Sequence, residues 1–373
     1  MRVMTIVGTR PEIIRLSRVL AKLEEHTDHT FVHTGQNYDY ELTDVFFDEL
    51  GIKHPDIRLS AAGATASETI GKVIIECGKV LEAKRPEALL ILGDTNSALA
   101  AIAAKRLKIP IFHMEAGNRC FDARVPEETN RRIVDVIADV NMPYSSLARE
   151  YLIQEGAPAD RIIKTGSPMF EVLDYYRPRI ETSDVLARLG LEEGRYFVVS
   201  CHREENVDDP SRAKALAQVL NRLAQDFAQP VIVSTHPRTR KRIEEFGIEF
   251  SALVQMHKPF GFFDYLALQK RARAVLSDSG TITEESSILN FPALNIREAH
   301  ERPEGFEEAA VMLTGFNYAR IAEGLAILDH QPRGEERLLL PVADYMRPNV
   351  SDKVLRIIIS YTDYIRRTVW GET

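Results

Sequence analysis

The stretch Ala274-Val275-Leu276-Ser277-Asp278-Ser279-Gly280-Thr281-Ile282-Thr283-Glu284-Glu285 decides the fold class of this chain. An apolar run ends in a small polar turn, and the residues that follow predict a helix with two early carboxylates. Ser279 and Gly280 would let the backbone approach a phosphate closely, and the first N–H groups of the helix would point at it. Glu284 or Glu285 would then meet a sugar diol. Helix capping alone also explains Ser and Gly at such a turn, so both interpretations stand at this point.

Five other junctions repeat this pattern. Each is a short apolar run, rich in β-branched residues, that ends in polar residues: 4–12, 88–96, 109–117, 196–206 and 231–237. In open parallel sheets, ligands bind at the carboxyl ends of the strands. Because such junctions occur in both halves, the sequence predicts an α/β protein with two parallel sheets that face a shared cleft.

Length and composition indicate a globular protein of two domains. The chain has 373 residues, of which 45% are hydrophobic and 27% charged, and its formal net charge is −8. We therefore expect no bulk binding to nucleic acid or to an anionic membrane. No apolar stretch approaches the roughly 20 residues that span a bilayer, and a predicted strand begins at once, so we expect no signal peptide. Three scattered cysteines indicate a reducing cytoplasm and no disulfide framework.

Periodicity gives a coarse map of the chain. Helices are predicted over 12–23, 67–83, 97–107, 127–140 and 146–155. A connection follows at 166–178, and a second βα series begins near Tyr196. Apolar residues at helical spacing between Val350 and Ile365 predict a terminal helix. This helix either closes its own domain or crosses back to the first one.

Several common catalytic motifs are absent from the sequence. There is no Walker A motif, and the first turn, Gly8 to Glu12, is not Gly-x-Gly-x-x-Gly. No Gly-x-Ser-x-Gly elbow and no His-Glu-x-x-His or other metal-ligand spacing is present. These absences argue against P-loop ATP chemistry, weaken the case for a nicotinamide or flavin cofactor, and give no indication of a metal site.

The first half concentrates carboxylates at predicted strand ends. Asp94 ends one strand, Glu115 ends the next, and Glu127 and Glu128 open a helix after Pro126. Helix capping also explains Asp94, and a favourable interaction with the helix dipole also explains the pair of glutamates. Neither explanation applies to Glu115. A carboxylate at the end of an apolar strand needs a charge partner or a functional role.

The second half concentrates cations and a helix start. His202 and His236 follow predicted strands, and Ser279-Gly280 supplies N–H donors. Arg10 and Arg15 would reach the same cleft from the first half. This pattern suits a diphosphate held mainly by the second half, with the carboxylates of the first half facing the group that the diphosphate carries.

The motifs also fall in the order of a known family. They comprise residues 8–12, 93–95, 113–119, 126–131, 202–206, 278–280 and 284–285. On these residues the chain resembles the non-hydrolysing UDP-N-acetylglucosamine 2-epimerase family along nearly its whole length. Within that family it is most similar to the UDP-N-acetyl-L-fucosamine synthases of capsule and O-antigen pathways. That closer resemblance depends on residues 34–42, 300–306 and 348–353.

The resemblance implies a GT-B-like arrangement of two Rossmann-like domains, residues 1–168 and 169–351, with the helix 352–373 crossing back to the first. It implies a cytoplasmic homodimer that binds a UDP-linked 2-acetamido sugar without metal or other cofactor. By motif match, the catalytic residues are Asp94, Glu115, Glu127 and His202. The residues matched to UDP-sugar binding are Arg10, Arg15, His236, Tyr265 (or Phe263) at the uracil, Ser279, Gly280, Glu285 at the ribose, and Arg302.

The implied reaction inverts C2 of UDP-2-acetamido-2,6-dideoxy-L-talose by eliminating UDP to a glycal and adding it back. The nearest alternative is the epimerase that interconverts UDP-N-acetylglucosamine and UDP-N-acetylmannosamine. A hydrolysing epimerase, a GT-B glycosyltransferase and a non-enzymatic UDP-sugar sensor are further alternatives. The family segment that binds a second, activating UDP-sugar is Gln36-Asn37-Tyr38-Asp39 here, which argues against such activation.

Overall fold

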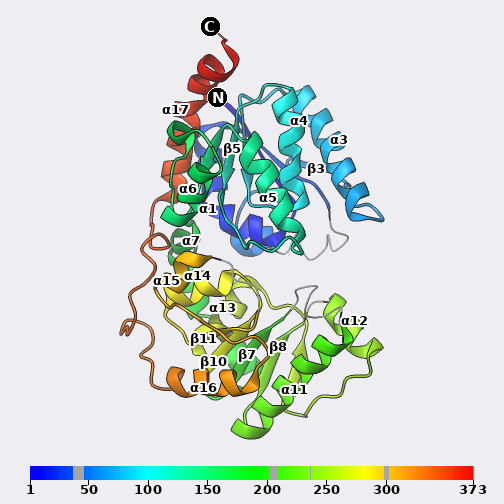
Figure 1. The fold of residues 1–373 in the computed structure, drawn as a ribbon, viewed down its shortest axis with the longest axis vertical. Helices are drawn as coiled ribbons and strands as arrows, with labels where there is room; N and C mark the ends of the chain where they lie inside the picture. The colour runs from blue at the N-terminus through cyan, green and yellow to red at the C-terminus, as the bar shows by residue number, and fades with distance from the viewer. Residues whose placement is uncertain (37–45, 202–208, 236, 298–301, 373) are drawn as a thin grey trace. The chain divides into compact units, whose positions relative to one another are not determined.

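The computed structural model describes residues 1–36, 46–201, 209–235, 237–297 and 302–372 (Figure 1). The chain forms two compact units. The first comprises Met1–Asp174 together with Asp344–Thr373, and the second comprises Tyr175–Ala343. The domain boundaries expected at 168 and 351 stay a prediction. No helix in the described part of the chain is long and apolar enough to cross a membrane.

The first unit contains a six-stranded parallel sheet of order β3-β2-β1-β4-β5-β6. Its strands are β1 (Arg2–Val7), β2 (Asp28–His33), β3 (Ile57–Arg58), β4 (Ala88–Leu92), β5 (Ile111–Met114) and β6 (Val140–Met142). Its helices are α1 (Arg10–His26), α3 (Ala66–Lys84), α4 (Ala101–Arg106), α5 (Pro126–Ile137), α6 (Ser146–Gln154) and most of α7 (Met169–Tyr175), with 3-10 turns η1 (Asn96–Ala100) and η2 (Ala159–Arg161). Every residue of β4 is buried, which explains why its sequence is continuously apolar.

The second unit repeats this architecture with the order β12-β11-β10-β7-β8-β9. Its strands are β7 (Phe197–Ser200), β8 (Val231–Ser234), β9 (Val254–His257), β10 (Ala274–Ser277), β11 (Ala293–Asn295) and β12 (Met312–Leu313). Its helices are α8 (Arg177–Glu181), α9 (Val185–Leu189), α11 (Pro210–Phe227), α12 (Pro237–Glu245), α13 (Phe262–Arg271), α14 (Thr281–Leu289), α15 (Pro303–Glu307) and α16 (Tyr318–Leu328). The paired strands of both sheets are parallel, so the predicted α/β class with two Rossmann-like sheets is confirmed.

The apolar stripe near the C-terminus is the helix α17 (Val350–Trp370), and it belongs to the first unit. It packs beside α1, as Figure 1 shows in red and blue. The Ser351 N–H donates to Glu171 over 2.8 Å, and the Tyr364 hydroxyl donates to Asp160 over 2.7 Å. The expectation of a terminal helix that returns to the first domain is therefore confirmed.

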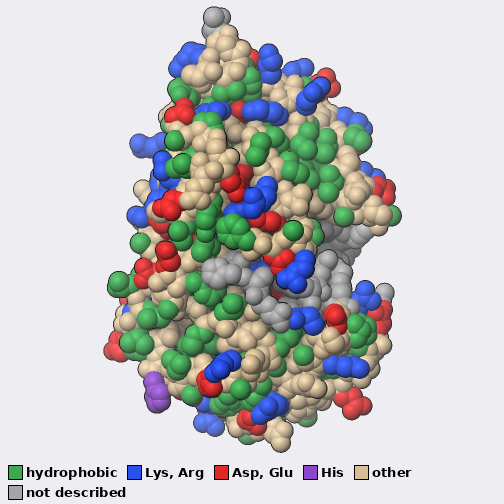
Figure 2. All heavy atoms as spheres, in the orientation of Figure 1, with side chains coloured by type: hydrophobic (Ala, Val, Ile, Leu, Met, Phe, Trp, Pro, Cys, Tyr) green, Lys and Arg blue, Asp and Glu red, His purple; other side chains and the backbone are tan. Residues whose placement is uncertain are grey.

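Two of the predicted helices differ from the structure, one in where it ends and one in being divided. The helix expected over 127–140 ends at Ile137, because Val140 begins the buried strand β6. The helix expected over 97–107 is split into η1 and α4. On the face of the molecule in view, Figure 2 shows Lys and Arg side chains interspersed with Asp and Glu, as on most globular proteins.

Candidate active site

The carboxyl ends of β1, β4 and β5 lie at one edge of the first sheet. β4 is hydrogen-bonded between β1 and β5, and the Gly93 N–H donates to the Met114 carbonyl over 3.0 Å. The turns that follow these three strands therefore lie side by side. They carry Arg10, Asp94 and Glu115, which the sequence predicts as site residues.

Glu12 joins the first two of these turns. Its Oε2 accepts hydrogen bonds from the N–H groups of Gly8 and Thr9 over 2.8 and 2.7 Å, and its Oε1 accepts from the Thr95 hydroxyl over 3.0 Å. Burial raises the pKa of the Glu12 carboxyl to about 7, although these donors lower it. The turn also requires a glycine, because a Cβ on Gly8 would lie 1.9 Å from the Ser97 hydroxyl.

Asp94 is held by α5. Arg131 Nη2 lies 2.7 Å from Asp94 Oδ2, and the Asn130 side-chain amide donates to the Asp94 carbonyl over 2.9 Å. Glu127 precedes Arg131 by four residues and therefore lies on the same face of the helix. Its side chain is half-buried and has no hydrogen-bond or ion-pair partner among the described residues. The structure thus brings Asp94 and the helix face of Glu127 together.

Glu115 lies in the left-handed region of backbone conformation, with φ +65°. Its Oε1 accepts from the Asn118 amide over 3.1 Å, and its Oε2 lies 3.8 Å from Arg15 Nη1. The Arg15 guanidinium also lies over the Tyr144 ring, 5.9 Å from its centroid. We expect a charge partner for Glu115 because it ends an apolar strand, and Arg15 of α1 is such a partner. Arg10 lies nearby in sequence and contacts the Phe46 ring at 4.9 Å.

A buried ionic network lies behind these carboxylates. His113 is fully buried, with Nε2 2.9 Å from the Gly93 carbonyl and Nδ1 3.0 Å from Asp135 Oδ1. Asp135 Oδ2 accepts from Arg119 Nη1 over 2.7 Å. Burial alone would lower the pKa of His113, but the Asp135 carboxylate, the Gly93 carbonyl and the Asp94 charge together raise it, and the net shift is upward.

Asp135 and Arg131 are functional residues that the sequence pattern does not single out. The spacing of charged residues could have identified both, because Glu127, Arg131 and Asp135 follow one another at intervals of four residues and so share one face of the helix. A face that carries alternating charges and packs on the sheet must pair them with groups of the opposite sign.

The second unit contains the predicted strand, turn and helix. β10 runs through Asp278, Ser279 and Gly280 into α14, for which Gly280 is the N-cap. The Ser277 hydroxyl accepts from the Ser279 N–H over 3.1 Å, and the Ser279 hydroxyl accepts from the Thr281 N–H over 3.3 Å. The local geometry that the sequence predicts is therefore present.

Glu285 is held from α13. The Gln269 amide donates to Glu285 Oε2 over 3.0 Å, inside the unit. Tyr265 lies one turn before Gln269. Burial raises the pKa of the Tyr265 hydroxyl, with a further contribution from the Glu285 charge. Glu284 points elsewhere, because its fully buried carboxylate lies 3.4 Å from Arg302 Nη1.

Phe263, the alternative aromatic to Tyr265, is part of the packing of its own unit. Its ring lies 5.3 Å from the Tyr176 ring, and the Arg179 guanidinium lies 4.3 Å from its centroid. His202 and His236 fall outside the described residues.

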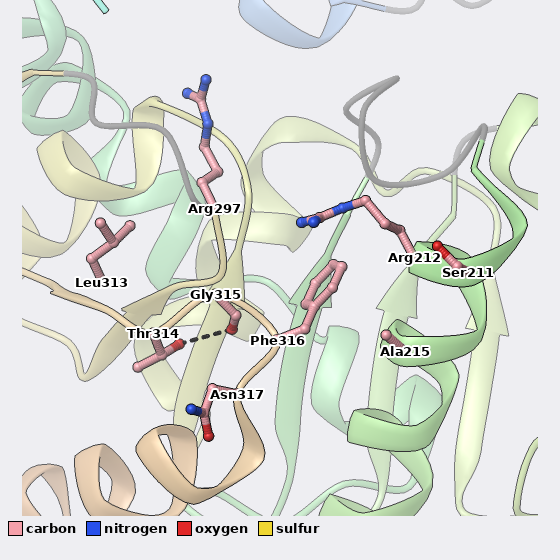
Figure 3. Close-up of a pocket in the computed structure, with 9 residues that line it drawn as sticks. All are labelled: Ser211, Arg212, Ala215, Arg297, Leu313, Thr314, Gly315, Phe316 and Asn317. Atoms are coloured by element: carbon pink, nitrogen blue, oxygen red, sulfur yellow. Dashed lines mark hydrogen bonds between the residues drawn. The ribbon is translucent and has the colours of Figure 1, made fainter.

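A separate cavity of about 470 Å³ opens on the second unit (Figure 3). Arg297 follows β11, while Arg212 extends from α11 and lies over the Phe316 ring at 5.2 Å. None of the predicted site residues is among the nine described residues that line it. This cavity is thus distinct from the turn at Ser279 and Gly280.

Comparison with known proteins places these features in a family. A family model described as UDP-N-acetylglucosamine 2-epimerase matches residues 21–359. The structure of UDP-N-acetylglucosamine 2-epimerase from Rickettsia bellii is similar over 100% of both chains, with 50% identity and a TM-score of 0.91.

Two further relatives are similar over most of their length. The structure of Methanocaldococcus jannaschii UDP-GlcNAc 2-epimerase in complex with UDP-GlcNAc and UDP has a TM-score of 0.89 and 32% identity, covering 96% of this chain and 100% of that chain. The UDP-2,3-diacetamido-2,3-dideoxy-D-glucuronate 2-epimerase of Pseudomonas aeruginosa is 35% identical over 84% of this chain and 88% of its own. The chain therefore belongs to the UDP-N-acetylglucosamine 2-epimerase family of isomerases.

Proposed function

We propose that this chain inverts C2 of a UDP-linked 2-acetamido sugar without net hydrolysis. The observation that carries the proposal is the edge of the first sheet, where Asp94 and Glu115 follow adjacent strands and the helix face of Glu127 packs on the Asp94 turn. General acid–base chemistry on a sugar ring needs several carboxyl groups within reach of one carbon. Family membership supplies the reaction class.

Direct removal of the C2 proton would be slow, because that proton is not acidic. In the proposed reaction the C1–O bond breaks first and UDP leaves with the bonding electrons. A carboxylate then takes the C2 proton, which gives a glycal. For the return, a UDP oxygen bonds to C1 again while a proton reaches C2 on its opposite face, so atoms and charge balance.

We assign the proton exchange to Asp94, Glu115 and Glu127. Asp94 and Glu115 have guanidinium partners, Arg131 and Arg15, which hold the two carboxyl groups in place. Glu127 has no such partner among the described residues, so its carboxyl group is the one of the three that no guanidinium holds in place.

The leaving diphosphate needs donors. We propose that the N-terminus of α14, at Ser279 and Gly280, binds it, since the backbone N–H groups and the dipole at the start of a helix favour an anion there. Further ligands in this proposal are Arg10, Arg15, Arg302, His202 and His236, with Glu285 at the ribose and Tyr265 at the uracil.

UDP-N-acetylglucosamine is the first substrate to test, because the R. bellii and M. jannaschii relatives are named for it. UDP-2-acetamido-2,6-dideoxy-L-talose, a precursor of capsule or O-antigen sugars, is the second. Motifs at 34–42, 300–306 and 348–353 favour it. The name of the P. aeruginosa relative shows that family members act on more than one sugar.

Proton NMR in D₂O with each UDP-sugar in a separate tube tests the proposal. Deuterium at C2 of a new C2-inverted UDP-sugar, with no free UDP accumulating, supports it and identifies the substrate. Accumulation of UDP with a free sugar would indicate a hydrolysing epimerase instead. Binding of either UDP-sugar without exchange at C2 would indicate a sensor.

We also propose that the chain is a homodimer. Two helices of the first unit expose apolar side chains: Ile75 of α3 is 57% exposed, and Val136 of α5 is 80% exposed. Burial of such side chains against a second copy would stabilise a dimer. Light scattering during gel filtration measures the mass, and a monomer mass would contradict the proposal.

A further inference from the structure

His113 lies at the centre of the first unit, two residues before Glu115. It is the third residue of β5, and its side chain has no exposed surface. A histidine in such a position can carry a charge only where an opposite charge lies close to it.

Both ring nitrogens lie close to oxygen atoms, but of the two only Nε2 makes a hydrogen bond within the described part of the chain, and Nδ1 is at ion-pair distance from a carboxylate. Nε2 lies 2.9 Å from the Gly93 carbonyl oxygen, and Nδ1 lies 3.0 Å from Asp135 Oδ1. A neutral imidazole with its single N–H on Nε2 would leave the Nδ1 lone pair 3.0 Å from the negative Asp135 carboxylate, whereas a second proton there would carry an opposite charge. The environment therefore selects the doubly protonated imidazolium.

The charges around the ring agree with this. Asp135 faces it from α5, and Asp94 contributes a second negative charge from the turn after β4. Arg119 is the nearby cation, and it binds the other oxygen of Asp135, at 2.7 Å. The Asp135 carboxylate raises the pKa of His113 in spite of the burial that lowers it.

The His113–Asp135 pair also holds the two turns of the candidate site. Gly93, whose carbonyl accepts from His113, has φ +72° and directly precedes Asp94. Asp135 accepts from the Gly117 N–H at 3.1 and 3.2 Å, and this N–H belongs to the turn that begins at Glu115. The pair thus joins β4, β5 and α5 directly beneath the two carboxylates.

We propose that His113 is a positioning residue that acts as a permanent buried imidazolium and fixes Asp94 and Glu115 for proton exchange. The inference rests on the proposed epimerase function for its catalytic consequence, but not for the charge state. Loss of the proton on Nε2 would replace the hydrogen bond to the Gly93 carbonyl by a repulsion between two lone pairs. The turn at Gly93 would then no longer be held by His113.

The charge state is tested first, by ¹⁵N NMR of the full chain labelled at histidine. The chain has ten histidines, and the variant His113→Gln identifies the signal by its disappearance. We expect both nitrogens of His113 to be protonated at pH 8, where an ordinary histidine is neutral. A neutral tautomer at pH 8 would overturn the proposal, whether or not the chain acts on a UDP-sugar.

The positioning role is tested by Asp135→Asn with Asp139→Asn as the matched control. Asp139 is also buried and paired, to Lys105 and to the Ile111 N–H, but at the opposite end of β5. We expect Asp135→Asn to lower kcat for C2 exchange about 100-fold, a typical cost of misplaced reacting groups, with little change in KM. Its activity should also fall at a lower pH than that of the unsubstituted chain, because the imidazolium loses its counter-ion.

Asp139→Asn should keep the pH profile. Equal losses in both variants at every pH would overturn the positioning role and leave only a structural one. Retained UDP binding shows that each variant is folded. If the unsubstituted chain exchanges no proton at C2, the proposed function fails, and the NMR result still decides the charge of His113.

Discussion

Arg131 lies between two carboxylates at the edge of the first sheet, 2.7 Å from Asp94 Oδ2 and 3.4 Å from Glu128 Oε2. Its side chain is only 3% exposed, whereas the side chain of Arg132, which binds the other oxygen of Glu128, is 44% exposed. The two adjacent arginines therefore bind different oxygens of Glu128. Of the two, only Arg131 also contacts Asp94, the candidate catalytic carboxylate.

This difference gives a matched pair of variants. Arg131→Gln removes a buried guanidinium and leaves the partly buried Asp94 without its cation, so we expect it to lower the free energy of unfolding by about 3 kcal/mol and to lower kcat. Arg132→Gln removes an exposed ion pair and should cost less than about 1 kcal/mol. Urea unfolding and the C2 exchange assay measure both quantities. Equal effects of the two substitutions would show that the buried pair has no special role.

Glu285 offers a test of the second unit. Gln269→Leu removes the amide that orients this carboxylate, so we expect the Kd of UDP to rise about tenfold, the cost of one charge-assisted hydrogen bond. Gln229→Leu is the control, because Gln229 is a similarly buried glutamine of the same unit, just before β8. Isothermal titration with UDP compares the two. An unchanged Kd in Gln269→Leu would remove Glu285 from the ribose site.

The fold could be predicted from the sequence largely because strands buried on both faces are continuously apolar. The run Ala88–Leu92 has no polar residue and ends at the turn that carries Asp94, and both features can be recognised in the sequence alone. The end of α5 could not be predicted, since Val134 and Ile137 continue the helical pattern and only the pairing of β6 with β5 stops it. Secondary-structure periodicity carries no information about that pairing.

The candidate site was only partly predictable. Asp94 and Glu115 can be recognised in the sequence as acids at the ends of apolar strands. Their partners Arg131 and Arg15 lie on helices, where charged residues are common. Their burial decides their role, and burial depends on how the helices dock. His113 was visible in its motif, whereas its two acceptor partners come from residues 20 and 22 positions away along the chain.

Glu12 makes the stability of the chain depend on pH. Its pKa is about 7 in the folded chain, against an ordinary value of 4.5. The folded state therefore binds a proton that the unfolded state has lost between these values, so the contribution of Glu12 to stability falls as pH rises from 4.5 to 7. The full cost above pH 7 is about 3 kcal/mol.

Glu12→Gln should remove this dependence. The amide oxygen can accept from Gly8 and Thr9, while the amide N–H can donate to the Thr95 hydroxyl. We expect the variant to gain stability over the unsubstituted chain at pH 8 and to show no gain at pH 5. Urea unfolding at the two pH values measures the difference. A gain of the same size at both values would contradict the raised pKa.

The glycine at the first turn gives a further prediction. In Gly8→Ala the new methyl group would lie 1.9 Å from the Ser97 hydroxyl and 2.6 Å from the Thr34 hydroxyl, so the turn must shift. Because that turn carries Arg10 and is tied through Glu12 to Thr95, beside Asp94, we expect both stability and C2 exchange to fall, with a loss of about 1–3 kcal/mol.

Gly71→Ala is the control for that substitution. Gly71 lies within α3, and a Cβ there meets no atom within 4 Å. Alanine should therefore raise stability by up to about 1 kcal/mol through helix propensity and leave exchange unchanged. Thermal unfolding and the exchange assay on both variants decide the matter. If Gly8→Ala behaved like Gly71→Ala, the close packing of Gly8, Ser97 and Thr34 would not constrain the site.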